Sequence, residues 1–211
     1  MDKKYLALTF DDGPNTTVTG AVLDILERHG IPATFFLIGD NINNDSAESV
    51  KRAVSLGCEI ENHSYTHRAF PSLSAEETAA EIAKTSALIK DITGKEPRFF
   101  RPPYIALSGE MFDRIPLTFI EGIGCEDWLD SVSAQERFER ITSAVKNGDV
   151  ILLHDMEGNQ KTAEAIEMII PCLKDRGYEF VTLSDLFLHL GVTPEKGVIY
   201  TNVLNAAPWV G

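Results

Sequence analysis

The chain has 211 residues, of which 44% are hydrophobic and 24% are charged, and its formal net charge is −13 at pH 7. This length and composition fit one globular domain with a sizeable core, and the negative charge disfavours nucleic acid and anionic membrane surfaces as partners. No apolar stretch approaches the roughly 18 residues that a membrane span requires, so membrane insertion is not expected.

The three cysteines, Cys58, Cys125 and Cys172, cannot all pair within one chain and do not have zinc-finger spacing. A disulfide framework is therefore not expected, and each thiol is interpreted as a small buried hydrophobic group. The first four residues lead directly into an apolar run without the hydrophobic core of a signal peptide. We therefore expect a soluble domain, which could have been trimmed from a longer protein.

The first half of the chain alternates short apolar runs with helical patterns. The sequence predicts a strand ending near Asp11, a helix ending near His29, strands over 33–38 and 58–60, and helices over 46–56 and 74–92. Ser74 and Glu77 have the spacing of a capping box, and Gly94 lies just beyond the end of the last of these helices.

The second half continues the alternation. Two prolines exclude both helix and a central strand at Arg101-Pro102-Pro103-Tyr104, so an extended loop is expected there. Around this loop the sequence predicts strands over 98–100, 117–120, 150–153 and 179–183, and helices over 134–145, 162–176 (bent at Pro171) and 186–190. Residues 201–211 give no clear prediction.

Strands that alternate with helices throughout indicate an α/β fold with a parallel sheet. Seven or so such units favour a distorted or incomplete (β/α) barrel of seven to eight strands, similar to a TIM barrel, over an open doubly wound sheet. We expect one domain over residues 1–211, with its core at about 5–190 and a tail over 191–211.

Polar residues gather where the predicted strands end, which in parallel barrels is where the chemistry takes place. These residues are Asp11, Asp12, His63, His67, Arg101, Asp127, Trp128 and His154. The two adjacent aspartates precede Gly13-Pro14, which ends the strand, so the carboxylates can have two different roles. The alternative is a turn in which one carboxylate caps the helix that starts near Thr16 or Thr17.

His63 and His67 are four residues apart, a spacing that puts two imidazoles on one face of a helical turn. With an aspartate they make a set of two histidines and one carboxylate, which leaves a position for water as catalytic zinc sites require. Cobalt, nickel, manganese and iron(II) suit the same ligands. A lone pair at this spacing is more often structural, but three of the five histidines lie at strand ends, which favours a metal site.

Five motifs in order resemble those of the polysaccharide deacetylase family, the family 4 carbohydrate esterases with the NodB-homology domain. The resemblance extends from about Tyr5 to Leu190. The motifs are Thr9 to Gly13, His63 to His67, Arg101 to Tyr104, Asp127-Trp128 and Leu152 to His154. The resemblance implies that Asp12, His63 and His67 bind one divalent metal ion, usually zinc, and that Asp11 is the general base.

The resemblance further implies that His154 is the general acid, held by Asp127, and that Arg101 pairs with the base aspartate. It assigns the backbone N–H of Tyr104 to the oxyanion. Trp128 and Leu152 would wall the pocket for the acetyl methyl group, although core packing is an alternative for both.

The match departs from the family at two places. Gly124 stands where many relatives have an aspartate, and Ile105 stands where a glycine often follows the tyrosine, so the rim and the access loop are expected to differ. The Gly-Cys-x-Asp-Trp form resembles clostridial acetylxylan esterases of this family more than chitin or peptidoglycan deacetylases. Cys125 lies near Asp127 and is interpreted as a packed thiol rather than a metal ligand.

The function implied is a metal-dependent hydrolase that removes acetyl groups from polysaccharide or oligosaccharide. Its substrate would be O-acetyl xylan, or N-acetyl amino sugars of chitin or peptidoglycan. A catalytically silent carbohydrate-binding protein and a hydrolase of a small non-sugar amide or ester are the alternatives. We expect a monomer that is secreted.

Overall fold

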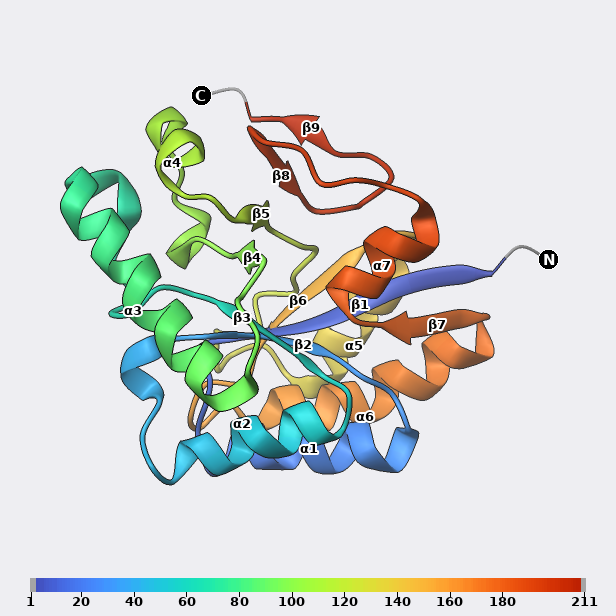
Figure 1. Cartoon of the computed structure of the whole chain (residues 1–211). Helices are drawn as coiled ribbons and strands as arrows, with labels where there is room; N and C mark the ends of the chain where they lie inside the picture. The colour runs from blue at the N-terminus through green and yellow to red at the C-terminus, as the bar shows by residue number, and fades with distance from the viewer. Residues whose placement is uncertain (1–2, 210–211) are drawn as a thin grey trace.

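The computed structural model describes residues 3–209, which form one curled sheet surrounded by helices (Figure 1). The strands are β1 (Lys4–Asp11), β2 (Thr34–Leu37), β3 (Glu59–Asn62), β4 (Phe99–Phe100), β5 (Thr118–Ile120), β6 (Val150–His154), β7 (Tyr178–Val181), β8 (Val198–Tyr200) and β9 (Ala207–Pro208). The helices are α1 (Val18–His29), α2 (Ser46–Ser55), α3 (Ala75–Thr93), α4 (Gly109–Arg114), α5 (Ala134–Ala144), α6 (Gln160–Asp175) and α7 (Leu183–Leu190).

The sheet has the strand order β6-β1-β2-β3-β4-β5-β8-β9, and β7 pairs with the first half of β1. All pairings are parallel except that of β8 with β9. The chain after β5 returns to β6 through a parallel bridge between Ile123 and Ile151, and Asp149 and Asn202 form a second bridge. The sheet therefore curls towards closure, and the predicted incomplete (β/α) barrel is confirmed.

The helices follow the strands around the outside, in the order α5, α6, α1, α2, α3 and α4. In Figure 1 the group α1, α2 and α6 lies below the sheet, and α3 and α4 lie to its left. Helix α7 is different, because it crosses the amino ends of the strands. The backbone N–H of Leu183 donates to Thr34 Oγ1 (3.0 Å) and that of Ser184 donates to Glu59 Oε2 (3.0 Å). Helix α7 thus covers the end of the barrel opposite the mouth.

Alternation along β1 divides the core and positions the first functional residue. Leu6, Leu8 and Phe10 pack outward in the cluster shared with α1 and α6, whereas Ala7 packs inside the barrel with residues of α7. Side chains at every second residue of a strand share one face, and Asp11 is four residues after Ala7. The Asp11 side chain is therefore on the interior face, at the carboxyl end of the strand. The strand pattern alone thus brings a carboxylate into the mouth.

Most predicted elements are confirmed to within a few residues, including the Ser74–Glu77 capping box and Pro171 inside α6. Helix α4 and strands β8 and β9 were not predicted. The loop after Arg101 is not fully extended, because Pro103–Ile105 makes a short 3₁₀ turn. Cys58 and Cys125 are buried, but the expectation is wrong for Cys172, which is half-buried. Among residues 3–209 no helix has the length and apolar character of a membrane span.

Candidate active site

A cavity of about 610 Å³ opens at the mouth of the barrel. Eight of the ten residues predicted from the sequence line it, namely Asp11, Asp12, His63, His67, Tyr104, Trp128, Leu152 and His154. The other two, Arg101 and Asp127, are 0% exposed and lie behind this lining. The structure therefore brings together residues from five separate motifs, with two buried charges supporting them from behind.

Asp12, His63 and His67 form a donor set whose ligand atoms all lie within 4.8 Å of one another. Asp12 Oδ1 is 3.4 Å from His63 Nε2 and 3.3 Å from His67 Nε2. This oxygen is buried and has no hydrogen-bond partner in the described part of the chain. His63 Nδ1 donates to the carbonyl of Arg101 (2.7 Å), which leaves a lone pair on Nε2 facing the aspartate. An orphaned carboxylate oxygen between two imidazole nitrogens fits a divalent cation.

The electrostatics of Asp12 and His67 favour the forms that bind metal. Burial alone raises the pKa of Asp12, but the His63 imidazole beside it and the charges of His154 and His67 lower it to about 2. Burial, helped by the neighbouring His63, lowers the pKa of His67 below its usual value. A carboxylate and neutral imidazoles are the states that ligation requires.

A left-handed backbone at Asp12, just after β1, brings its side chain to the cavity that Asp11 also lines. Asp12 has φ 73°, so its side chain does not continue the alternation of the strand. Gly13 follows, and a Cβ there would lie 2.6 Å from Asp155 Oδ2, so only glycine fits. The alternative in which an aspartate caps the next helix is wrong. Asn15 Oδ1 accepts from the N–H groups of Thr17 and Thr19 instead.

The segment from His63 to His67 is a loop, so the expected helical turn is wrong. Ser64 (φ 69°) and His67 (φ 57°) are left-handed, and this conformation still brings the two rings to a centroid distance of 4.9 Å. Glu81 of α3 holds the loop. Its carboxylate accepts from the N–H groups of Tyr65 (2.9 Å) and Thr66 (2.7 Å) and from Thr66 Oγ1 (2.7 Å).

Glu81 is a residue that sequence reasoning missed. A signal was present, because Glu81 lies on the buried stripe of α3 with Thr78, Ile82, Thr85 and Ile89. A carboxylate on an apolar stripe needs polar partners. Its partners come from a loop that the sequence alone does not bring near.

Asp11 is held by Arg101 from behind. Arg101 Nη1 donates to Asp11 Oδ1 at 2.5 Å, and Nη2 donates to the carbonyl of Glu121. The guanidinium also lies 4.2 Å from the centre of the Phe36 ring. Asp11 Oδ2 is 3.7 Å from His63 Nε2, next to the donor set. One oxygen of Asp11 is therefore fixed, and the other is beside the candidate metal position.

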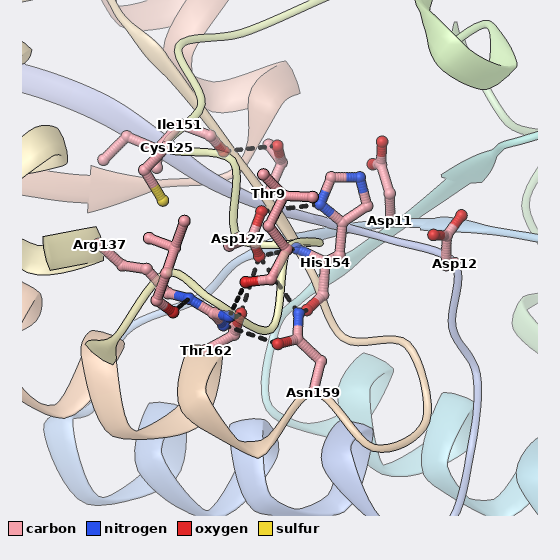
Figure 2. Close-up of polar contacts among 12 residues, drawn as sticks. Thr9, Asp11, Asp12, Cys125, Asp127, Arg137, Ile151, His154, Asn159 and Thr162 are labelled. Atoms are coloured by element: carbon pink, nitrogen blue, oxygen red, sulfur yellow. Dashed lines mark hydrogen bonds and ion pairs between the residues drawn. The ribbon is translucent and has the colours of Figure 1, made fainter.

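His154, which lines the same cavity, forms a second pair with Asp127 (Figure 2). His154 Nδ1 donates to Asp127 Oδ1 (2.8 Å), and the backbone N–H of His154 donates to Asp127 Oδ2 (2.7 Å). Burial alone lowers the pKa of His154, but the hydrogen bond and charge of Asp127, with Asp11 and Asp12, raise it to about 9. His154 can therefore hold a proton on Nε2 at neutral pH.

The three residues that were predicted for the substrate pocket, Tyr104, Trp128 and Leu152, line the cavity. Trp128 is 49% exposed and its ring meets the His154 ring edge-on at 5.5 Å, so it is not a core residue. Leu152 is only 6% exposed yet lines the cavity, so both interpretations hold for it. Tyr104 has φ 60° and is 71% exposed, with its ring 4.6 Å from that of His67.

The rim near Trp128 contains two glycines with different constraints. A Cβ on Gly122 (φ 144°) would lie 2.9 Å from Leu152 Cβ and from the carbonyl oxygen of Val150, so close packing requires glycine there. A Cβ on Gly124 would meet only ordinary contact, at 3.7 Å from the carbonyl of Leu152. Cys125 lies outside the donor set, and burial raises the pKa of its thiol to about 12.

The comparisons with known proteins agree with these motifs. Residues 1–115 match the polysaccharide deacetylase family model. A bifunctional xylanase/deacetylase of Pseudobutyrivibrio xylanivorans is 46% identical over 204 residues, which are 96% of this chain and 34% of that protein. The chain thus spans about a third of the length of this curated relative.

Two solved structures are similar over nearly their whole length. The Xyl-CE4 domain of a multidomain xylanase from the hindgut metagenome of Trinervitermes trinervoides has a TM-score of 0.94 and 45% identity, covering 96% of this chain and 99% of that one. A family 4 acetyl xylan esterase from Clostridium thermocellum, in complex with cobalt, has a TM-score of 0.92 and 40% identity, covering 95% and 99%. The chain belongs to the polysaccharide deacetylase family.

Proposed function

We propose that this chain is a metal-dependent deacetylase that hydrolyses acetyl groups on polysaccharide, with O-acetyl xylan as its substrate. The observation that carries the proposal is the orphaned Asp12 Oδ1 between His63 Nε2 and His67 Nε2, with Asp11 beside it and His154 in the same cavity. The names of the relatives, a xylanase/deacetylase and an acetyl xylan esterase, support the choice of xylan. N-acetyl amino sugars of chitin or peptidoglycan are the other branch.

Asp12, His63 and His67 would hold one divalent ion, for which we propose zinc. Such an ion supplies positive charge for the acyl oxygen and makes a water acidic enough to lose a proton near neutral pH. Cobalt occurs in the acetyl xylan esterase structure, and nickel and manganese suit the same ligands.

Asp11 is the proposed general base. Arg101 occupies its Oδ1, so Oδ2 is the oxygen that takes the proton of the attacking water. The fixed rotamer matters, because a base must lie within hydrogen-bond reach of the proton that it removes.

His154 is the proposed general acid. With Nδ1 donating to Asp127, its Nε2 proton is free to go to the leaving oxygen of the sugar, or to a leaving nitrogen in the N-acetyl branch. The backbone N–H of Tyr104 would donate to the oxyanion, and Trp128 and Leu152 would enclose the acetyl methyl group.

Acetate release from acetylxylan, N-acetylated chito-oligosaccharides and peptidoglycan, with zinc or cobalt added, tests this proposal. Release mainly from acetylxylan is expected. Release mainly from the amino-sugar polymers would show that the substrate is an N-acetyl amino-sugar polymer instead of xylan. Activity only on small synthetic esters would favour a non-sugar hydrolase, and no release from any substrate would favour a silent carbohydrate-binding protein.

We also propose that the protein acts as a monomer outside the cell, where its polymer is found. Light scattering of the purified chain tests the first point, and detection in culture medium tests the second.

A further inference from the structure

A buried arginine lies behind the His154–Asp127 pair (Figure 2). Arg137 belongs to α5 and is 1% exposed. Its guanidinium donates to four oxygens, all of them uncharged. They are the carbonyls of Val132 (3.1 Å) and Leu129 (3.2 Å), Asn159 Oδ1 (2.6 Å) and Thr162 Oγ1 (2.9 Å). Burial of a cation among neutral acceptors is costly in free energy. The other hydrogen bonds of these acceptors therefore indicate what the arginine is for.

Two of the acceptors also hold Asp127. Thr162 Oγ1 donates to Asp127 Oδ2 at 2.7 Å, and Asn159 Nδ2 reaches the same oxygen at 3.4 Å. Asn159 Nδ2 also donates to the carbonyl of His154 at 2.9 Å. Arg137 and His154 are therefore joined through two side chains from the start of α6, although they do not touch.

The arginine sets the direction of both links. A guanidinium can only donate, so Thr162 Oγ1 and Asn159 Oδ1 must accept from it. The threonine hydroxyl then turns its single proton to Asp127, and the asparagine amide turns its NH₂ end the same way. Without Arg137 the hydroxyl could rotate and the amide could flip.

As a result, the two oxygens of the Asp127 carboxylate have different hydrogen-bond partners. Asp127 Oδ2 accepts from the N–H of His154, from Thr162 and from Asn159, whereas Oδ1 accepts from the imidazole. The charged groups that face this imidazole are Asp127 from the segment after β5, Asp11 at the end of β1, and Asp12, which directly follows β1.

We propose that Arg137 is a positioning residue for the acid, which acts through Thr162 and Asn159 to fix Asp127 and thereby to aim the His154 imidazole at the cavity. The acid role of His154 rests on the proposed function. The geometry of the link from Arg137 to His154 does not.

The loss of kcat on substrates with different leaving groups distinguishes a positioning role from a general disruption of the active site. Arg137→Gln and Thr162→Val are expected to lower kcat on acetylated xylo-oligosaccharide by about 10- to 100-fold. On 4-nitrophenyl acetate, whose leaving group needs no proton, the loss should stay below about 3-fold. Matched controls are Arg28→Gln, an exposed arginine paired with Glu167, and Thr142→Val, whose hydroxyl bonds the carbonyl of Phe138. Equal losses on both substrates would overturn the proposal.

A second measurement does not depend on activity. In the zinc-loaded protein, the His154 imidazole is titrated by NMR, with its resonance assigned by comparison with His154→Asn. Its midpoint is expected to fall by about one pH unit in Arg137→Gln and Thr162→Val and to stay unchanged in the controls. An unchanged midpoint in a folded Thr162→Val protein would refute the link, even if Arg137→Gln fails to fold. A shifted midpoint in a chain that releases no acetate would reject the proposed function and keep the link.

Discussion

Two parts of the site differ in how their polar atoms are satisfied. We call them the metal side, which is Asp12 with His63 and His67, and the acid side, which is Asp127 with His154. On the metal side a buried oxygen of Asp12 has no partner among residues 3–209, and the backbone at Asp12, Ser64 and His67 is left-handed. On the acid side both oxygens of Asp127 have hydrogen bonds from neighbouring residues. The metal side thus has an unsatisfied carboxylate oxygen that a cation would fit, whereas the polar atoms of Asp127 on the acid side are satisfied by neighbouring residues.

Loss of a ligand should break the metal side alone. In His63→Ala we expect bound zinc to fall from one equivalent to almost none and turnover to disappear, while the acid side keeps its hydrogen bonds. Zinc at 100 times its dissociation constant should stabilise the wild type by about 2.7 kcal/mol and the variant not at all. Metal analysis and thermal melts with and without zinc measure this, with His189→Ala on α7 as the control. Undiminished zinc in His63→Ala would contradict the ligand assignment.

Loss of the base should leave both sides intact. Asp11→Asn is expected to keep its zinc and to lose about 10²- to 10⁴-fold in kcat, because an amide cannot take a proton from water. The assay is acetate release from acetylxylan, with metal content measured on the same sample. The control is Asp24→Asn, which alters only an exposed ion pair with Arg52. Retained turnover in Asp11→Asn would show that another group is the base.

Loss of the carboxylate on the acid side should give a smaller and pH-dependent effect. Asp127→Asn is expected to keep zinc and to lose about 10- to 100-fold on acetylxylan. The raised pKa of His154, about 9 against the usual 6.5, stabilises the folded wild type fully below pH 6.5, and this contribution is lost as the pH rises through 9. The wild type should therefore exceed the variant in free energy of unfolding by more at about pH 6 than at about pH 10.

Urea unfolding of the wild type and Asp127→Asn at the two pH values provides the measurement. A difference that does not change with pH would mean that the charge on His154 is not coupled to Asp127.

Loss of the loop support should weaken the metal side without removing a ligand. Glu81→Gln replaces a carboxylate oxygen that accepts from the loop by an NH₂ group or a weaker acceptor, so zinc affinity should fall by about 10- to 100-fold. Competition with a chelator measures the affinity, and Glu164→Gln on the exposed face of α6 is the matched control. Equal affinities in the two variants would show that the loop keeps its conformation without Glu81.

The sequence was sufficient for residues whose position follows from strand order. Asp11 lies at the mouth because of alternation along β1, and His154 is its register partner on β6. Glu81 and Arg137 could not be predicted, because their roles depend on partners far away in the sequence, a loop for one and the start of α6 for the other. The conformation from His63 to His67 was misjudged for a related reason. Spacing predicts a helical turn, but the hydrogen bonds to Glu81 decide the backbone.

The central place of β1 has a consequence for how the protein inactivates. This strand pairs with β2, β6 and β7 and also carries Asp11 and, one residue later, Asp12. Its amides should exchange with solvent only when the whole domain opens. Heat should therefore abolish acetate release and native structure over the same temperature interval.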